Sequence, residues 1–332
     1  MKSAILLVGG FGTRLQPLTL STPKPMLPVG GIPFTEHQII KARDAGVTEI
    51  VLATSFMAEV FEPYFGNGER FGIDIAYAVE EVALGTGGAI ANAAKSLKNQ
   101  GPVVIFNGDV LSGHDLQAQM HLHLETESDV TLYLTEVPDA RAYGVVEMSG
   151  SRIRTFNEKM ENPPTNIINA GCYIFNREIL TYIPDDRVVS IERETFPYLL
   201  SAGKVVSGFV DNSYWLDIGT PSALRRATSD LIAGNVQSSA FDDFISHGTH
   251  IRTKESMVSI SAVVAPGVVL KEGSFISAGV MIDRGSQLSG TFVGESAHVG
   301  ADSQLVNCFI ASGSDIPAGC IATNNFFGYS AE

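Results

Sequence analysis

The chain has few cysteines and no long apolar run, and each shortage excludes a class of protein. Its three cysteines, Cys172, Cys308 and Cys320, are odd in number and scattered, so they offer neither a disulfide framework nor a CxxC zinc site. No apolar run reaches the ~18–20 residues that span a bilayer, and the run Ala4–Val8 is too short for a secretory signal. We therefore expect a cytoplasmic protein with no membrane partner.

Basic residues are also scarce, because 22 Lys and Arg stand against 36 Asp and Glu and give a net charge of −14. A surface of this charge repels polyanions, so we expect no nucleic acid partner. A small anionic substrate would still need local positive charge, which basic residues clustered at one site would supply. The 332 residues, 45% of them hydrophobic, suffice for two domains with cores of their own.

Short apolar runs alternate with helical patterns over residues 1–235. The runs are rich in Val and Ile and are bounded by Gly, Asn or Asp, which is typical of strands. We expect strands at Ser3–Val8, Glu49–Ala53, Asp74–Val79, Val103–Phe106 and Val130–Leu134, and helices at Phe34–Ala45 and Gly88–Leu97. This alternation predicts an α/β domain with a Rossmann-like, mostly parallel sheet, helices on both faces and ligands at the carboxyl ends of the strands.

A different pattern begins at residue 256 and continues to residue 332, after a polar linker at 236–255. Apolar residues recur every six positions, at Val258, Val264, Leu270, Ile276, Ile282 and Leu288, and after a shift of phase at Val293, Val299, Leu305, Ile310 and Ile316. A six-residue period predicts a parallel β-helix whose apolar side chains point inward, and the pattern resembles left-handed hexapeptide-repeat helices. Such a rod stacks and pairs well, so we expect a homo-oligomer formed through it.

A glycine-rich loop, Gly9-Gly10-Phe11-Gly12-Thr13-Arg14, follows the first expected strand. Its three glycines let backbone N–H groups approach an anion closely, and Arg14 can donate two hydrogen bonds to phosphate oxygens. Ten residues further on, Lys24 lies between two prolines, which fix the path of the chain around it. The loop is not a Rossmann fingerprint, because Leu15 stands at the third glycine position, and it lacks the Gly-Lys-Ser/Thr of a Walker A loop.

This segment, with Thr13-Arg14-Leu15, Pro17-Leu18-Thr19 and Pro23-Lys24-Pro25, resembles the signature loop of the nucleotidyl-transferase (sugar-nucleotide pyrophosphorylase) family. The resemblance covers residues 1–235, and a hexapeptide tail is a common attachment in that family. It implies an enzyme that joins a nucleoside triphosphate to a hexose 1-phosphate and releases pyrophosphate. The nearest resemblance within the family implies GTP and mannose 1-phosphate as the substrates, with a glucose-1-phosphate uridylyl- or thymidylyltransferase as the alternative.

The resemblance also implies a set of nucleotide-binding residues. They are Val8, Gly9, Gly10, Gly12, Thr13, Glu80, Gly85 and Thr86. Guanine presents two adjacent donors that one carboxylate can accept, whereas uracil or thymine suits an amide better. Glu80 therefore favours guanine, and the competing interpretation is that it only stabilises the N-terminus of the helix that follows.

Two aspartates are expected to bind Mg²⁺. Asp109 follows the strand Val103–Phe106, and Mg²⁺ prefers carboxylate oxygens together with substrate phosphates. The resemblance adds Asp217 as the second ligand. It also implies a sugar-phosphate-binding set, which comprises Asn107, Gly144, Glu158, Lys159 and Asn169. Met160 follows Lys159 where many family members have proline, a small departure that leaves the role of Lys159 standing.

The implied reaction is an in-line attack by an oxygen of the sugar phosphate on the α-phosphorus of the nucleotide. The attacking phosphate is already ionised at pH 7, so the enzyme must position two anions and neutralise their charge. Arg14 would stabilise the β- and γ-phosphates, Lys24 would bridge the α-phosphate, and Lys159 would hold the sugar phosphate. Arg14 and Lys24 are therefore the expected catalytic residues.

Two other functions remain open. Hexapeptide helices also form acyltransferases, which need a catalytic histidine, and His298 is the only histidine of the repeat region. Non-catalytic regulatory subunits share the fold but usually lose motif residues that this chain keeps. The histidines as a group offer no metal site, and we expect His121, His123, His247 and His250 at the solvated surface.

Overall fold

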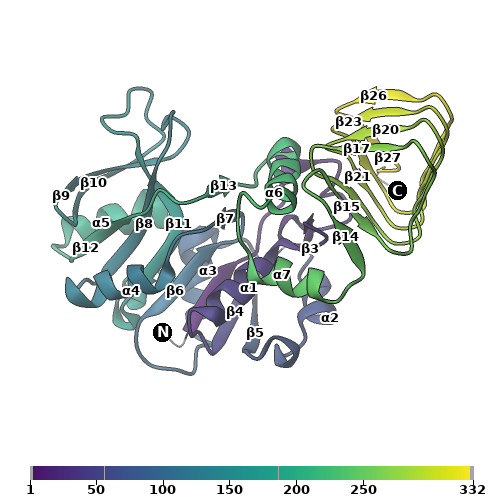
Figure 1. Ribbon diagram of the computed structural model, residues 1–332. Helices are drawn as coiled ribbons and strands as arrows, with labels where there is room; N and C mark the ends of the chain where they lie inside the picture. Colours follow the sequence, from purple (N-terminus) through teal and green to yellow (C-terminus); the bar gives the residue numbers. More distant parts are fainter. Residues whose placement is uncertain (1–2, 56, 186, 330–332) are drawn as a thin grey trace. The chain divides into compact units, whose positions relative to one another are not determined.

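A computed structural model of the chain describes residues 3–55, 57–185 and 187–329 (Figure 1). The chain divides into two compact units, and each is built from two stretches of sequence. Unit 1 comprises Met1–Gly10 and Gln38–Trp215, and unit 2 comprises Phe11–His37 and Leu216–Glu332. The second half of the glycine-rich loop thus belongs to unit 2, although the sequence pattern assigned it to the same domain as the rest of residues 1–235. The domain boundaries at 235 and 256 stay a prediction.

The core of unit 1 is a nine-stranded sheet (Figure 1). Its order is β5 (Asp74–Val79), β4 (Glu49–Thr54), β1 (Ser3–Leu7), β6 (Val103–Asn107), β11 (Ile167–Phe175), β8 (Val130–Glu136), β12 (Val206–Val210), β10 (Arg152–Glu158) and β9 (Gly144–Ser149). Neighbours from β5 to β6 pair in parallel, and all of these strands except β10 and β11 point the same way. The predicted α/β class is confirmed, with strand ends that shift by at most two residues.

Helices cover both faces of this sheet. α3 (Gly85–Ala94) packs on the face that carries Leu132 of β8. α4 (Leu116–Glu125) lies on the opposite face, where His123 Nδ1 is 2.9 Å from the Thr131 hydroxyl, because successive side chains of a strand point to opposite faces. Other helices are α1 (Phe34–Asp44), α2 (Phe61–Phe65), α5 (Phe196–Ser201), α6 (Pro221–Ala233) and α7 (Ser239–Ser246). Within the described residues, no helix has the length and apolar character needed to cross a bilayer.

The expectation of a solvated His123 is wrong. The residue is 1% exposed, and its Nε2 lies 3.2 Å from Asn176 Oδ1 in addition to the Thr131 contact. These partners allow a neutral ring to be buried, and burial lowers its pKa. His121, two positions earlier on α4, has an 83% exposed side chain as expected. Two positions on a helix turn a side chain by roughly 200°, so one ring faces the sheet and the other faces solvent.

The carboxyl ends of β1 and β6 bring two loops together in unit 1. The strands pair in parallel with Leu7 opposite Asn107, and Gly108 N–H donates a hydrogen bond to Leu7 O (3.0 Å). A side chain at Gly108 would collide with that carbonyl oxygen, so this close approach requires glycine. The start of the glycine-rich loop therefore lies beside the turn that follows β6.

Unit 2 contains the predicted β-helix, whose coils stack in parallel sheets (Figure 1). One sheet holds β15 (Ser256–Ser259), β18 (Ser274–Ile276), β21 (Phe292–Val293), β24 (Phe309–Ile310) and β27 (Phe326–Phe327), a second holds β16 (Val263–Val264), β19 (Met281–Ile282), β22 (His298–Val299) and β25 (Asp315–Ile316), and a third holds β17 (Val269–Lys271), β20 (Gln287–Ser289), β23 (Gln304–Val306) and β26 (Ile321–Thr323). The residues predicted to point inward, among them Ile276, Ile282 and Leu288, form a buried core. The β-helix prediction is confirmed.

The coil lengths explain the shift of phase in the repeat. The first coil advances 18 residues, from Val263 to its partner Met281, and the following coils advance 17. The missing residue lies at one corner, in the interval from Leu288 to Val293. Gly290 at this corner has a φ of 55°, which glycine adopts without strain. A shorter corner therefore changes the spacing without changing which residues point inward.

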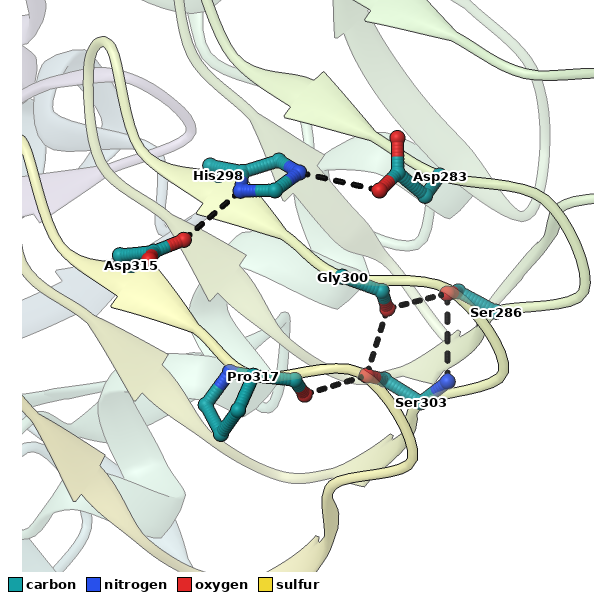
Figure 2. A network of polar contacts seen from close by, with 7 residues as sticks. All are labelled: Asp283, Ser286, His298, Gly300, Ser303, Asp315 and Pro317. Carbon is teal, nitrogen blue, oxygen red and sulfur yellow. Dashed lines mark hydrogen bonds and ion pairs between the residues drawn. The ribbon is translucent and has the colours of Figure 1, made fainter.

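Buried serines add hydrogen bonds between neighbouring coils (Figure 2). Ser286 Oγ and Ser303 Oγ both donate to Gly300 O, at 3.0 and 2.7 Å, and Ser303 Oγ also lies 3.3 Å from Pro317 O. These hydroxyls satisfy main-chain carbonyls that the strand ladders leave at the corners. The small polar residues of the repeat are thus structural.

The predicted linker at 236–255 contains regular structure. α7 buries Phe241, and β14 (His250–Arg252) pairs antiparallel with β15. The Phe241 ring lies 2.8 Å from where a side chain at Gly30 would begin, so the two segments pack closely within unit 2. His250, expected at the surface, is half-buried with its ring centre 5.4 Å from that of Phe275. A helix of two turns is too short to show a readable apolar period.

His37 on α1 is a buried histidine that the fold of unit 2 keeps neutral. Its Nε2–H donates to Val29 O (2.9 Å), and its Nδ1 accepts from the Ser238 hydroxyl (2.7 Å). Burial lowers its pKa from 6.5 to about 4, and the hydrogen bond to Val29 O opposes this only in part. A second ring proton would remove the acceptor for Ser238 and leave a buried charge.

We expect the stability that neutral His37 provides to be lost in acid. The unfolded ring binds a proton below about pH 6.5, whereas the folded ring does so only near pH 4. The contribution is therefore complete above pH 6.5 and declines as the pH falls, by roughly 3 kcal/mol at pH 4. Denaturant unfolding should show a smaller loss of stability between pH 7 and pH 5 in His37→Gln than in the wild type. Equal losses in both proteins would contradict this assignment.

Candidate functional site

The first part of the glycine-rich loop leaves β1 within unit 1. Val8 N–H donates to Ala53 O (3.0 Å), and Gly9 packs so closely on Ser55 that an added Cβ would lie 2.6 Å from its Oγ. Gly10 has a φ of 121°, a conformation that glycine alone adopts readily. Apart from Gly10 and its two neighbours in the chain, no described residue has an atom within 4 Å of where its side chain would begin. The backbone at Gly10 is thus open on one side, as an anion-binding loop requires.

The loop continues in unit 2, where it lies beside Lys24. Gly12 has a φ of 57°, and its carbonyl oxygen accepts a hydrogen bond from the Thr19 hydroxyl (3.0 Å). An added Cβ at Gly12 would lie 3.0 Å from Lys24 Cβ. Lys24 begins a short 3₁₀ turn, Lys24–Met26, directly after the extended Pro23. The proline-bounded segment thus presents its lysine next to the loop.

Arg14 lies on a second short turn, Thr13–Leu15, which the buried Leu15 anchors. The arginine itself is exposed. Its guanidinium lies against Gly219, where an added Cβ would be 2.7 Å from Nη2. Gly219 follows Asp217 by two residues, so unit 2 brings Arg14 against the segment that carries one predicted metal ligand.

The predicted base-reading segment forms the loop before α3. Glu80 Oε2 accepts a hydrogen bond from Leu84 N–H (2.9 Å), and burial raises the pKa of Glu80, which this hydrogen bond opposes in part. The Glu80 carboxylate thus stabilises the loop before α3 through this hydrogen bond, and its oxygens can still accept further hydrogen bonds from a ligand. Gly85 opens α3 with a φ of 73°, and a side chain there would lie 2.6 Å from Val189 O.

Thr86 is hydrogen-bonded to Glu192, a residue that the sequence analysis did not single out. Thr86 Oγ1 donates to Glu192 Oε2 (3.0 Å) and accepts from Ile191 N–H (2.9 Å). Burial raises the pKa of Glu158, and the nearby charge of Glu192 raises it further. Glu192 therefore contacts Thr86 of the predicted nucleotide set, and its charge acts on Glu158 of the predicted sugar set. A single glutamate without a surrounding motif carries no signal in one sequence.

Gly144 and Glu158 face each other as register partners of β9 and β10. A side chain at Gly144 would lie 2.7 Å from the Phe156 ring and 2.9 Å from Glu158 Oε2, so only glycine leaves this space open. Lys159 follows with a φ of 54°, which is uncommon for a residue with a side chain. Its N–H donates to Tyr143 O (3.1 Å), which holds the exposed lysine in that conformation.

Asn169 shapes a bulge in β11. Its Oδ1 accepts from Gly171 N–H (3.2 Å) and its Nδ2 donates to the Tyr173 hydroxyl (2.9 Å), while Gly171 has a φ of 80°. Asn107 lies beside this bulge, with its Nδ2 3.1 Å from where a Gly171 side chain would begin. Asn107 Oδ1 is buried and has no hydrogen-bond partner among the described residues. It is therefore an acceptor that a substrate hydroxyl could satisfy.

The structure brings the predicted sugar set together in unit 1. Ile168 of β11 pairs with Val145 of β9, which places Asn169 next to Gly144. Glu158 lies opposite Gly144 on the other side, and Lys159 is the next residue along the chain.

Asp109 and Asp217, the predicted Mg²⁺ ligands, are both half-buried. Asp109 lies in unit 1 on the turn after β6, and Asp217 lies in unit 2 at the end of β13 (Trp215–Asp217). Mg²⁺ is usually held by one or two carboxylates, with phosphates and waters completing its shell. No group of three or more His, Cys, Asp or Glu in the described parts of the chain is arranged to hold a metal alone. Each carboxylate taken singly is the kind of donor that suits an ion which arrives with a phosphate substrate.

His298 bears on the acyltransferase alternative (Figure 2). Its Nδ1 lies 2.7 Å from Asp315 Oδ1 and its Nε2 lies 3.1 Å from Asp283 Oδ2. The hydrogen bonds to the two carboxylates raise the pKa of His298, so the protonated ring is favoured. A general base must be neutral and must present a nitrogen to its substrate. The arrangement therefore disfavours acyl transfer at this histidine.

The model of the nucleotidyl transferase family matches residues 3–234. This chain belongs to the nucleotidyl transferase family. The match runs from β1 to the end of α6 and includes every residue of the predicted site. The family indicated by the motifs is confirmed, and the enzyme class with it.

Three individual proteins that resemble this chain differ in the nucleotide or activity that their names state. Mannose-1-phosphate guanylyltransferase of Mycobacterium tuberculosis is 43% identical over 320 residues, which cover 96% of this chain and 82% of that protein. HddC from Yersinia pseudotuberculosis, complexed with GMP-PN, is 30% identical with a TM-score of 0.57 and covers 68% of this chain and 98% of its own. A Bacillus anthracis protein provisionally assigned as glucose-1-phosphate thymidylyltransferase, in complex with a sucrose, is 27% identical with a TM-score of 0.64 and covers 73% of this chain and 99% of its own. The fold alone therefore does not select the base.

Proposed function

We propose that this chain transfers the guanylyl group of GTP to mannose 1-phosphate, giving GDP-mannose and pyrophosphate. The observation that carries the proposal is the 43% identity to mannose-1-phosphate guanylyltransferase of Mycobacterium tuberculosis, which extends over 96% of this chain. The presence of Arg14, Lys24, Asp109, Lys159 and Asp217 favours an active enzyme over a regulatory subunit.

The proposed chemistry needs no general base, because the attacking sugar phosphate is already ionised. The backbone of Val8, Gly9, Gly10, Gly12 and Thr13 would hold the triphosphate, with the open side of Gly10 as the closest approach. Arg14 would neutralise the β- and γ-phosphates and the pyrophosphate as it leaves. Lys24, packed beside Gly12, would stabilise the charge that develops on the α-phosphate. The rate enhancement then comes from position and charge.

The sugar phosphate would bind to the set in unit 1. We assign its phosphate to Lys159 and its hydroxyls to Glu158, Asn169, Asn107 and the backbone of Gly144. Asn107 Oδ1 supports this assignment, because it is buried, has no hydrogen-bond partner among the described residues and can accept a hydrogen bond from a sugar hydroxyl. Glu192, whose charge helps to raise the pKa of Glu158, would couple this pocket to Thr86 through its hydrogen bond to the threonine hydroxyl.

Nucleotidyl transferases of this family generally use Mg²⁺. We propose Asp109 and Asp217 as its ligands in this chain. When bound, the ion would neutralise phosphate charge and polarise the phosphoryl group under attack.

Glu80 and Gly85 would meet the guanine edge. A carboxylate accepts from the two adjacent donors of guanine, N1–H and N2–H, and the Glu80 carboxylate is half-buried, where such hydrogen bonds are stronger than in water. Its existing bond to Leu84 N–H uses one oxygen, Oε2. That bond would orient the carboxylate before the base arrives.

We also propose a catalytic domain at 1–235 and a rod at 256–332 that forms a homo-oligomer. Exposed apolar side chains on the rod support this, because Val263 is 65% exposed and its neighbour Met281 is 50% exposed. A cytoplasmic location fits the need for GTP. It also fits Cys172, Cys308 and Cys320, which lie among the described residues and form no disulfide.

The test is pyrophosphate release by the purified protein with Mg²⁺. GTP, UTP, dTTP, ATP and CTP would each be combined with mannose, glucose and N-acetylglucosamine 1-phosphates. We expect the fastest release from GTP with mannose 1-phosphate. Faster release from UTP or dTTP with glucose 1-phosphate would keep the family and discard the role of Glu80. No release from any pair would favour a regulatory subunit.

A further inference from the structure

Two side chains of α1 contact the turn that carries Asp109. We call residues 107–112, from the end of β6 through β7 (Val110–Ser112), the aspartate turn. Gln38 Nε2 donates to Asn107 O (2.7 Å) and to Val110 O (3.3 Å). The amide group therefore joins the two residues that flank Gly108 and Asp109.

Lys41 lies three positions after Gln38, on the same side of α1, and contacts the far end of the aspartate turn. Its Nζ donates to Ser112 O (2.7 Å) and lies 3.1 Å from Ser112 Oγ and 3.0 Å from His114 Nδ1. His114 is itself 3% exposed and stacks on Tyr133 with ring centres 3.9 Å apart. The Lys41 ammonium group is thus fixed on one side by His114, a buried residue that is itself packed against Tyr133.

These contacts are costly to build for a merely structural purpose. Burial lowers the pKa of Lys41 to about 8, against the opposing influence of Cys172, Asp211 and Asp115. An apolar side chain would fill the same space without this penalty. Backbone carbonyls at the ends of a turn, by contrast, need strong and directional donors if the turn is to keep one conformation.

We propose that Gln38 and Lys41 are positioning residues, which hold the aspartate turn in the conformation that lets Asp109 bind the divalent cation. The inference rests on the proposed function, since it takes Asp109 as a metal ligand. A helix that is rigid across one turn sets the distance between the two contacts, and the aspartate turn then has little freedom between them. Groups that orient a ligand in this way typically change metal affinity by about 10–100-fold when removed.

Arg177 offers a matched control in unit 1. Its guanidinium donates to Asn99 O (2.6 Å) and Leu97 O (2.9 Å), so it is also a cationic side chain that holds backbone carbonyls. It contacts a segment outside the aspartate turn. Arg177→Met removes a cation that holds backbone carbonyls, as Lys41→Met does, and it should leave metal binding unchanged.

The experiment measures Mn²⁺ binding to the full chain by water-proton relaxation, with GTP present and sugar phosphate absent, in wild type, Asp109→Asn, Gln38→Met, Lys41→Met and Arg177→Met. We expect the Mn²⁺ dissociation constant to rise about tenfold in Gln38→Met and Lys41→Met and to stay within twofold in Arg177→Met. The Mg²⁺ concentration that half-saturates turnover should rise in the same two variants, with little change in the KM for sugar phosphate.

The outcomes separate this proposal from the one it rests on. Weakened Mn²⁺ binding in Asp109→Asn alone, with normal binding in both methionine variants, would overturn the positioning role. Unchanged binding in Asp109→Asn would overturn the metal assignment itself and the positioning role with it. If a methionine variant fails to fold, Gln38→Asn keeps a polar side chain but withdraws it by one methylene, and it should show the same rise in the dissociation constant.

Discussion

Replacing Arg14 or Lys24 with methionine is expected to lower turnover by about two to four orders of magnitude while the protein stays folded. One preorganised donor at a site of developing charge is worth about 10²–10³ in rate, and an arginine on transferring phosphates about 10³–10⁵. Arg14 is exposed and its turn is anchored by Leu15, so truncation should leave the fold intact. Pyrophosphate release under saturating substrates, with thermal unfolding measured alongside, checks the expectation.

A matched control is Arg226→Met on α6. Arg226 is also exposed, at 67% of its side chain, and pairs only loosely with Asp230 at 3.4 Å. It should retain wild-type turnover and a similar melting temperature, since exposed ion pairs contribute little. Near-normal turnover in both Arg14→Met and Lys24→Met would remove these residues from the proposed mechanism.

Replacing Glu80 with glutamine is expected to lower kcat/KM for GTP by about 30–100-fold, which corresponds to about 2–3 kcal/mol for hydrogen bonds to a charged acceptor. Glutamine can still accept from Leu84 N–H through its oxygen, so the loop before α3 should keep its shape. It can accept from only one of the two guanine donors, because its second terminal atom is itself a donor. The same substitution should raise activity with UTP or dTTP relative to GTP.

Glu81→Gln is the control for this substitution, because Glu81 is the adjacent residue and is exposed. Removing its charge tests the general loss of negative potential near the loop without touching the Leu84 contact. We expect less than a threefold change with any nucleotide. If both variants lose GTP activity equally, local charge and not base recognition governs the effect, and Glu80 would keep only its structural role.

Much of the fold could be predicted from the sequence, because the signals are local. Strand candidates such as Asp74–Val79 are bounded by turn residues. The six-residue spacing of Ile276, Ile282 and Leu288 identifies directly which residues of the repeat point inward. The phase shift after Leu288 was visible too, but its cause, a corner that is one residue shorter, needed the coil register.

The candidate site was less predictable, because its support comes from contacts between distant segments. Gly85 and Thr86 belong to a motif, whereas Glu192, which binds Thr86 from 106 positions away, does not. His123 illustrates the same limit, since its burial depends on Thr131 and Asn176 and not on its neighbours in the chain.

The sequence by itself determined the fold class, the repeat and the chemical types at the site, because backbone conformation and apolar periodicity are properties of neighbouring residues. Only the tertiary structure decided which segment supports each candidate side chain of the predicted site. It placed Lys24 beside Gly12, Arg14 against Gly219, and Gln38 and Lys41 beneath the turn of Asp109. These contacts depend on how packed elements meet in space, which no local pattern encodes.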